Sequence, residues 1–147
     1  MSNRIKLKIV TPEKLILEEE VDAVIVPTLE GEITILPEHI PIVAGLKSGD
    51  IVGIKDGEHI PMAVVGGFIE VKKENNETMV VILADFAEHV ADITEESIAK
   101  SKARAEELKK LAEDKGVVDF EHFAAELEKS LTRIKIADKW KSKKYRR

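Results

Sequence analysis

"VVILADFAEHVADITEESIAKSKARAEEL", residues 80–108, contains the point at which the chain changes its hydrophobic period. It opens on continuous Val, Ile and Leu, which is typical of a buried strand. After residue 92 small and apolar residues recur three or four positions apart, at Ser101, Ala105 and Leu108, which is the spacing of one helix face. The stretch predicts that strands precede residue 92 and that helices follow it.

Upstream of residue 92, short runs rich in Val and Ile show a period of two and are separated by turn residues. Asp56-Gly57 between two runs is a hairpin signal, and Pro61 predicts that its run is an edge strand or carries a bulge. Short strands without intervening helices predict an antiparallel sandwich or flattened barrel. The runs are IKLKIV (5–10), VDAVIVP (21–27), EITIL (32–36), DIVGIK (50–55), HIPMAVV (59–65), GFIEVK (67–72) and TMVVILA (78–84).

Downstream, the spacing predicts a helix over 94–115 and a second helix that begins near residue 120. Asp92 with Glu95 has capping-box spacing, with Thr94 as an alternative N-cap. Gly116 is a natural helix stop, and Asp119 can cap the second helix, so the two form an antiparallel hairpin. The predicted seams are Ile98, Ser101, Ala105, Leu108 and Ala112 on the first helix and Phe120, Phe123, Leu127, Leu131 and Ile134 on the second. Because the first seam is made of small residues, the hairpin is only marginally stable unless it docks on something.

The predicted fold class is therefore α+β, segregated, with an N-terminal antiparallel β-sandwich followed by a C-terminal antiparallel two-helix hairpin. We divide the 147 residues into a β-sandwich (1–91), a helical hairpin (92–140) and a basic tail (141–147). At 44% hydrophobic and only 4% aromatic residues, the chain predicts an aliphatic core. We expect no signal peptide, because MSNRIKLKIV alternates apolar and polar residues and lacks a continuous apolar region. We expect no membrane span, because no apolar run approaches the ~20 residues that a bilayer requires.

Signatures of an enzyme are scarce. The absence of cysteine excludes disulfides, thiolate zinc sites and cysteine nucleophiles. The four histidines are scattered without the i, i+4 spacing of a helical zinc site. GGF at 66–68 lacks the spacing of a phosphate-binding loop, and no nucleophile elbow occurs. The sequence gives no support for catalysis, so a free-standing enzyme is the least favoured of three hypotheses.

Charge is distributed unevenly along the chain. From Lys129 to the end, nine bases face Asp138 alone, so this part carries +8 while the whole chain carries −5. Anionic membrane, nucleic acid or an acidic protein surface are candidate partners for such a segment, and a solubilising tail is the alternative. The overall acidity and the shortage of aromatics, with only Trp140 and Tyr145 there, argue against nucleic acid.

Four segments together resemble the epsilon subunit of bacterial F-type ATP synthase, which is called delta in mitochondria. They are GEITILPEHIP (31–41), VVGGFIEV with VVILADFAEHV, the start of the hairpin with ARAEE, and ELEKSLTRIKIADK near the end. The first is similar to a family pattern of the type GE-x-G-I-L-P-x-H-x-P, with Thr34 where glycine is common. The resemblance covers essentially the whole chain and implies a non-catalytic rotor subunit that serves ATP synthesis and proton transport.

The resemblance implies that the sandwich binds the gamma subunit and sits on the ring of c subunits. The implied interface residues are Gly31, Glu32, Ile33, Thr34, Leu36, Pro37, His39 and Pro41. The prolines of this segment reduce the conformational freedom that docking would remove, and Glu32 could accept charge-assisted hydrogen bonds. The implied partners are the gamma subunit, the c ring and the catalytic beta and alpha subunits, with no nucleic acid. The implied location is the cytoplasmic face of the bacterial plasma membrane, with membrane association only through the complex.

The resemblance also implies that the hairpin inhibits ATP hydrolysis by extending along gamma, with basic residues facing an acidic stretch of beta. The matching residues are Lys129, Arg133, Lys135 and Lys139. An alternative is a nucleotide-sensing module in which a ligand holds the hairpin against the sandwich.

Some relatives bind ATP through an I-D-x-x-R-A motif at the start of the first helix. Glu88, Arg104 and Arg133 match residues of that pocket. This chain lacks the motif itself: Thr94 replaces the aspartate, Ser97 the arginine and Ile98 the alanine. Since an arginine is a planar, charged group with five donors, its loss predicts weak or absent ATP binding and no cofactor.

Overall fold

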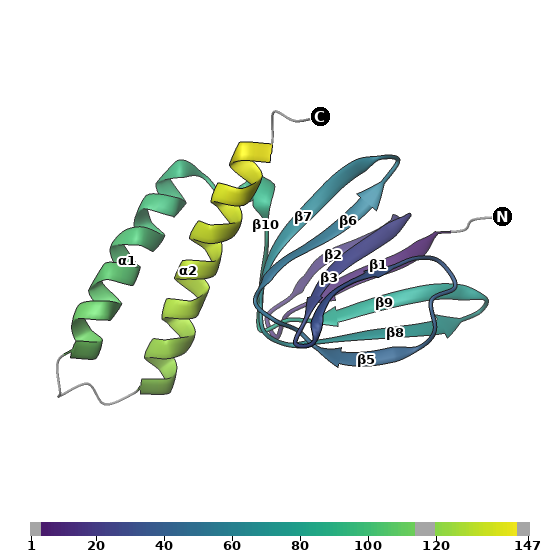
Figure 1. The fold of residues 1–147 in the computed structure, drawn as a ribbon, viewed down its shortest axis with the longest axis horizontal. Coiled ribbons are helices and arrows are strands. Elements are labelled where there is room, and N and C mark those ends of the chain that lie inside the picture. The colour runs from purple at the N-terminus through teal and green to yellow at the C-terminus, as the bar shows by residue number, and fades with distance from the viewer. Residues whose placement is uncertain (1–3, 114–119, 144–147) are drawn as a thin grey trace. The chain divides into compact units, whose positions relative to one another are not determined.

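A computed structural model describes residues 4–113 and 120–143. The chain divides into two compact units, Met1–His89 and Val90–Arg147. The first unit is a β-sandwich and the second a pair of helices, as Figure 1 shows. The predicted fold class is thus confirmed. Neither helix of the described residues is long and apolar enough to cross a membrane.

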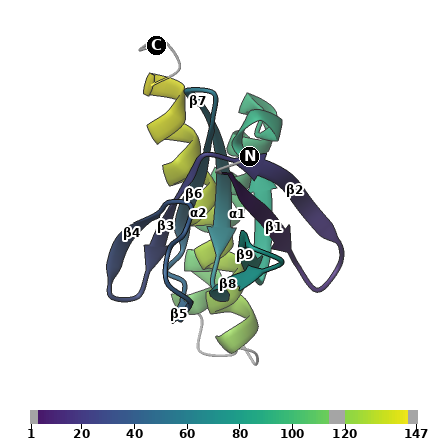
Figure 2. The ribbon, with the colours of Figure 1, turned by 90° about the vertical axis from the view of Figure 1, so that its right-hand side faces the viewer.

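The sandwich consists of two five-stranded sheets, in the orders β2-β1-β9-β8-β5 and β10-β7-β6-β3-β4. Their strands are β1 (Ile5–Val10), β2 (Leu15–Val21), β3 (Ala23–Thr28), β4 (Gly31–Ile35), β5 (Ile42–Gly45), β6 (Gly49–Lys55), β7 (Glu58–Val65), β8 (Phe68–Glu74), β9 (Glu77–Leu83) and β10 (Phe86–His89). β3 and β4 form a hairpin at one edge of their sheet (Figure 2). Every pairing is antiparallel except that of β1 with β9, which is parallel.

In most strands, alternation places one face in an aliphatic core, whereas residues 51–53 of β6 and 62–65 of β7 are buried on both faces. In β1, for example, Ile5, Leu7 and Ile9 are fully buried, and Val80 and Ile82 of β9 are buried beside them. Because successive side chains of a strand point to opposite faces, the residues between them form the outer face of the sheet.

The strands β2, β5 and β10 were not predicted from the sequence. β2 contains three consecutive glutamates, β5 has four residues, and β10 lies where the period changes. The predicted run VDAVIVP joins the end of β2 to most of β3 across Asp22. Polar or very short strands carry too little alternation to be recognised, and pairing with neighbours specifies them instead.

Pro61 lies where β7 has a neighbouring strand on one side only. The predicted edge strand is therefore correct at Pro61 but not for β7 as a whole. β7 lies between β10 and β6, but β10 pairs only with Met62–Val65. At Pro61 the strand therefore has one neighbour, β6, and the missing N–H of proline costs no pair with β10.

The second unit opens with a short 3₁₀ turn, η1 (Val90–Asp92), followed by α1 (Glu95–Glu113) and α2 (Phe120–Lys143). Of the predicted α1 seam, Ser101, Ala105 and Leu108 are confirmed as buried, and Ile98 is half-buried. The α2 seam was partly wrong, because Leu131 is 42% exposed. Among the α2 side chains that the structure describes, the most buried are Ser130, Thr132, Ile136 and Ala137. Gly116, Asp119 and the tail from residue 144 lie outside the described residues, as do the side chains of Ala112 and Phe120.

Candidate functional site

The segment predicted as one interface, 31–41, has two structural parts. Gly31–Ile35 is the edge strand β4, which contains Glu32, Ile33 and Thr34, and residues 36–41 form a loop. A five-residue strand spans roughly 15 Å at about 3.3 Å per residue. Gly31 and His39 therefore lie toward opposite ends of the sandwich and make separate surfaces.

The loop 36–41 is held by hydrogen bonds to the sheet and within itself. Glu38, which has a positive φ of 73°, donates its N–H to the Thr78 hydroxyl at 2.8 Å, and its carboxylate pairs with Lys73. The His39 N–H donates to the Leu36 carbonyl at 3.1 Å, and its ring Nδ1 lies 2.7 Å from the Ile40 carbonyl. Leu36 and Ile40 remain 56% and 71% exposed, so an ordered loop presents two aliphatic side chains to solvent.

At the other end of β4, the turn that leads into Glu32 is closed by Thr28. The Thr28 hydroxyl donates to the Gly31 carbonyl at 2.5 Å and accepts from the Glu30 N–H at 3.3 Å. Gly31 has a φ of 126°, a conformation that L residues rarely adopt. Glu30 and Glu32 are exposed beside it.

This end of the sandwich carries five loops (11–14, 29–30, 46–48, 66–67 and 84–85), and hydrogen bonds link most of them to neighbouring strands and loops. We call it the hydrogen-bonded end. Its links are Leu29 N–H to Gly45, Leu46 N–H to Gly67, Lys47 N–H to Pro27, Ala84 N–H to Val10 and Asp85 N–H to Val65, all to carbonyls at 2.8–3.1 Å, with Gly66 N–H to the Ser48 hydroxyl at 3.3 Å. Such mutual bonding stiffens loops that would otherwise move independently.

Exposed apolar side chains border the same end. Register places Leu15 opposite Val10, Val10 opposite Leu83, Leu83 opposite Phe68, and Phe68 opposite Gly45. Because directly paired residues lie on the same face, these side chains form a line across the outer face of the sheet. Leu29 continues the line, since its Cδ1 lies 2.6 Å from where a Cβ on Gly45 would stand.

We call Leu15, Val10, Leu83, Phe68 and Leu29 the apolar row. Leu15, Leu83, Phe68 and Leu29 are 48%, 56%, 61% and 71% exposed. The neighbouring positions of this face are largely charged: Lys8 opposes Glu18, Lys6 opposes Glu20, and Glu70 and Lys72 follow on β8. A contiguous exposed apolar patch within a charged surface marks an interaction site.

Sequence reasoning missed the apolar row. Phe68 and Leu83 were included in predicted strands, but it was not recognised from the sequence that their side chains point away from the core. The available signal was that both stand one position out of step with the buried residues of their strands, Ile69 and Ile82.

In the second unit, the start of α1 is a reciprocal capping box. The Thr94 hydroxyl accepts from the Ser97 N–H at 3.1 Å, and the Ser97 hydroxyl accepts from the Thr94 N–H at 2.9 Å. Thr94 is therefore the N-cap, rather than Asp92. The two residues that replace the aspartate and arginine of the nucleotide motif cap the helix together.

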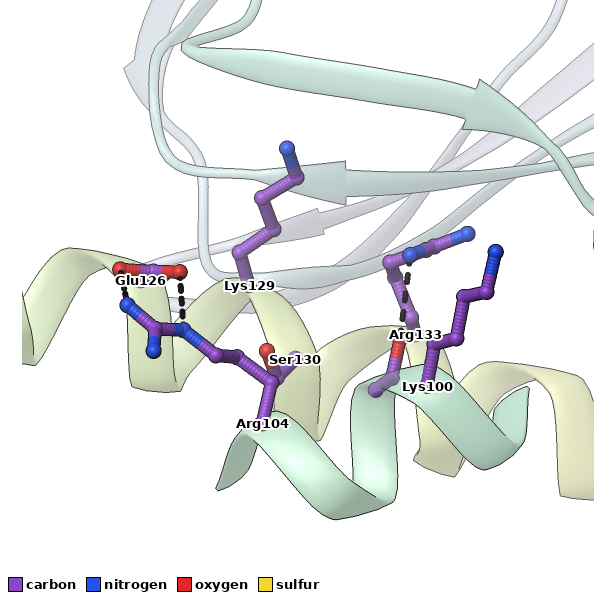
Figure 3. Close-up of a pocket in the computed structure, with 7 residues that line it drawn as sticks. Lys100, Arg104, Glu126, Lys129, Ser130 and Arg133 are labelled. Carbon is purple, nitrogen blue, oxygen red and sulfur yellow. Dashed lines mark hydrogen bonds and ion pairs between the residues drawn. The ribbon is translucent and has the colours of Figure 1, made fainter. Parts of the chain in front are cut away.

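A shallow groove of about 210 Å³ lies between the two helices (Figure 3). It is lined by four cationic side chains, two serines and one carboxylate: Lys100, Arg104, Lys129, Arg133, Ser101, Ser130 and Glu126. Arg104 binds Glu126 through two hydrogen bonds of 2.6 and 3.0 Å. Their hydrogen bond holds the pKa of Glu126 below its usual value. Arg133 donates to the hydroxyl of the buried Ser101 at 3.0 Å.

The four basic residues predicted to contact the beta subunit do not share one face of α2. Lys129 and Arg133 are four residues apart and line the groove. Lys135 and Lys139 are also four apart but lie about 120° around the helix from the first pair, at about 100° per residue. Lys139 lies 5.8 Å from the centre of the Trp140 ring.

The three residues predicted for a nucleotide site lie in both units. Glu88 is on β10 of the sandwich, whereas Arg104 and Arg133 line the groove of the hairpin. Within the described residues, no group of three or more His, Asp or Glu side chains could hold a metal ion.

Comparisons with known proteins give a consistent result. Residues 4–90 match the family model described as ATP synthase, Delta/Epsilon chain, beta-sandwich domain. The chain is similar to the ATP synthase epsilon chain of Desulforamulus reducens, with 39% identity over 94% of this chain and 100% of that one. It is also similar to the ATP synthase epsilon chain of Dehalococcoides mccartyi, with 40% identity over 92% of this chain and 94% of that one.

Two solved structures share the fold. One is a chain in the mitochondrial ATP synthase of Euglena gracilis, described as OSCP/F1/c-ring, with a TM-score of 0.63 and 23% identity over 99% of this chain and 84% of that one. The other is a chain in the central stalk/c-ring structure of the Tetrahymena thermophila mitochondrial ATP synthase, with a TM-score of 0.54 and 14% identity over 92% and 95% of the two chains. At these identities the similarity concerns the fold.

Proposed function

The chain belongs to the ATP synthase delta/epsilon chain family, and from this premise we propose that it couples the catalytic head to the c ring and regulates ATP hydrolysis. It is an epsilon chain, a non-catalytic subunit of the complex. We place it in the central stalk, at the cytoplasmic face of the bacterial plasma membrane, where it associates with the membrane only through its partners.

The observation that carries the coupling role is the apolar row at the hydrogen-bonded end of the sandwich. A subunit that transmits torque needs a contact that does not deform, and loops bonded to neighbouring strands and loops at 2.8–3.1 Å supply one. The row provides the apolar area, and Glu32 with Gly31 provides polar contacts beside it. We assign this end to the polar loops of the c ring and the adjoining surface of gamma.

The loop 36–41 at the opposite end of β4 forms a second contact. Leu36, Pro37, His39 and Pro41 flank the exposed Ile40 in sequence. The bonds of Glu38 to Thr78 and Lys73 order the backbone before docking. Ordering in advance lowers the entropy lost on binding. We assign this loop to gamma, so that the sandwich engages its partners at both ends of β4.

The hairpin regulates hydrolysis through basic residues on α2. Lys129, Arg133, Lys135 and Lys139 are oriented toward two sides of the helix, which suits a helix that inserts between surfaces rather than one that lies on a single surface. An acidic stretch of beta, with alpha beside it, is the proposed complement.

Nucleotide sensing is the second candidate function, and the geometry favours it less. The positions that would supply the aspartate and arginine of the motif hold Thr94 and Ser97, which cap α1. Arg104 and Arg133 already have partners inside the hairpin. We expect weak or absent ATP binding by isothermal titration. A dissociation constant in the low micromolar range would overturn this expectation.

The experiment that tests the proposal is ATP hydrolysis by the epsilon-free catalytic complex of the same organism, with the full chain or a chain stopped after Ala91 added back. If both bind and only the full chain slows hydrolysis, the sandwich anchors and the hairpin inhibits. If both bind and neither slows hydrolysis, the inhibitory role is wrong and coupling remains. If neither binds, the proposed function as a whole is wrong.

A further inference from the structure

The groove between α1 and α2 has the composition of an anion-binding site. Four of its seven lining residues are cationic, and two of the others are serines with buried side chains, Ser101 and Ser130. Lys100 is 77% exposed and pairs with Glu96 of its own helix, whereas Arg104 and Arg133 contact the opposite helix. A carboxylate or another anion beside Arg104 lowers the repulsion among these positive charges.

The only carboxylate that lines the groove within the described residues is Glu126. It projects from α2 and meets the Arg104 guanidinium of α1 with both oxygens, at 2.6 and 3.0 Å, as the dashed lines of Figure 3 show. A fork of this kind is the geometry in which arginine binds carboxylate or phosphate most strongly. Arg104 also contacts Glu107 at 3.1 Å, but that residue is on the same helix and so does not join the two.

Two further polar contacts join the helices along their length. Arg133 of α2 donates to Ser101 of α1 at 3.0 Å, and Lys141 of α2 pairs with Glu95 of α1 at 2.7 Å. The Lys141–Glu95 pair is well exposed, so it contributes little. The buried seam combines the small residues Ser101 and Ala105 with the larger Leu108 and Ile136. The fork adds a directional contact to this seam, because Arg104 and Glu126, whose side chains are 40% and 30% exposed, join the two helices.

We propose that the Glu126 carboxylate is the built-in anion of this groove and holds the hairpin closed without any phosphate ligand. The inference deepens the regulatory role proposed above and rests on it for its physiological meaning. A tethered carboxylate has a high effective concentration at Arg104, so a free phosphate anion must displace it to bind. Hairpin closure in this chain is consequently insensitive to phosphate compounds.

The first test measures the distance between α1 and α2 in the full chain, with Glu126 unchanged. The chain has no cysteine, so nitroxide labels on Ala99→Cys and Asp138→Cys report the distance between exposed positions on α1 and α2. We expect a closed distance in phosphate-free buffer and no change on addition of inorganic pyrophosphate. A hairpin that is open without anion and closes with pyrophosphate would overturn the proposal.

The second test asks whether removal of the carboxylate creates an anion site. Glu126→Gln preserves shape and removes charge, and Glu106→Gln, an exposed position of α1 outside the groove, is the matched control. We expect pyrophosphate affinity, measured by titration calorimetry, to rise about ten- to hundredfold in Glu126→Gln, the effect of one charge-assisted hydrogen bond. Glu106→Gln should match the wild type.

Equal affinity in the wild type and in Glu126→Gln contradicts the proposal. If Glu126→Gln loses its helical circular dichroism, the distance measured in the labelled chain that keeps Glu126 still tests whether closure needs a phosphate anion. Neither readout uses ATP hydrolysis. A chain that fails to inhibit the catalytic complex but keeps its closed, pyrophosphate-insensitive hairpin would refute the proposed regulatory role and leave the role of Glu126 standing.

Discussion

At the scale of single residues, Gly67 shows how close packing restricts the corner between the two sheets. Its φ is 105°, and a Cβ there would lie 2.0 Å from the Leu83 carbonyl oxygen and 2.8 Å from the Ala84 Cα. Both neighbours are backbone atoms, which cannot rotate away as a side chain can.

We expect Gly67→Ala to destabilise the sandwich by about 3 kcal/mol, through backbone strain and overlap together. Gly57→Ala is the control, because Gly57 also has a positive φ, 78°, but no atom within 4 Å of its Cβ position. Strain alone should cost about 1 kcal/mol there. Urea unfolding measures both, and equal losses would show that the overlap at Gly67 is relieved.

Thr94 is the residue on which the start of α1 depends. Thr94→Ala removes the hydroxyl that accepts from the Ser97 N–H, so we expect the hairpin to lose about 1 kcal/mol. Thr94→Ser keeps the hydroxyl and should retain most of that stability. Thermal unfolding followed by helical circular dichroism makes the comparison, and an undiminished midpoint in Thr94→Ala would mean that another group caps the helix.

At the scale of elements, the two helices combine a buried seam of small and aliphatic side chains with polar contacts. The hydrogen bond from Lys141 lowers the pKa of Glu95, and the hydrogen bond from Arg104 lowers the pKa of Glu126, both from 4.5. A carboxyl whose folded pKa is depressed stabilises the fold above its unfolded pKa and loses that contribution as pH falls through the folded value.

The hairpin should therefore keep its stability above about pH 4.5 and lose it progressively below that value. Helical circular dichroism as a function of pH measures the loss. In Glu126→Gln the side chain cannot titrate, so its acid transition should be shallower than that of the wild type. An identical transition in the two chains would show that Glu126 does not contribute.

At the scale of the whole molecule, the apolar row is the part of the sandwich surface that we expect to dock on a partner. Phe68 and Leu83 are 61% and 56% exposed, so their loss should cost the isolated fold little. We expect Phe68→Ser with Leu83→Ser to weaken binding to the epsilon-free complex at least about tenfold, because buried aromatic anchors dominate interfaces.

Val43→Ser is the matched control for that double substitution. Val43 is 72% exposed on the same sheet but pairs with Glu70 in the charged part of the face. Binding by Val43→Ser should equal that of the wild type. Equal binding by the double variant would exclude the apolar row from the interface.

Much of the fold follows from local pattern. Alternation at Ile5, Leu7 and Ile9 identifies a strand with one buried face, and the spacing of Ser101, Ala105 and Leu108 identifies a helix with one buried stripe. Glycine and proline end these elements for reasons of backbone geometry that require no knowledge of neighbours. The order of sandwich and hairpin was predictable on these grounds. The assignment of segment 31–41 to an interface came instead from the family resemblance and remains a prediction.

The sequence by itself determined which residues are strand or helix over most of the chain, since hydrophobic period and turn chemistry act over a few residues. Only the tertiary structure decided the parallel pairing of β1 with β9, the separation of Gly31 from His39 by a strand, the line from Leu15 to Leu29, and the fork of Arg104 with Glu126. Each joins residues remote in sequence or depends on strand register, and a shift of one residue in register would turn every side chain to the opposite face.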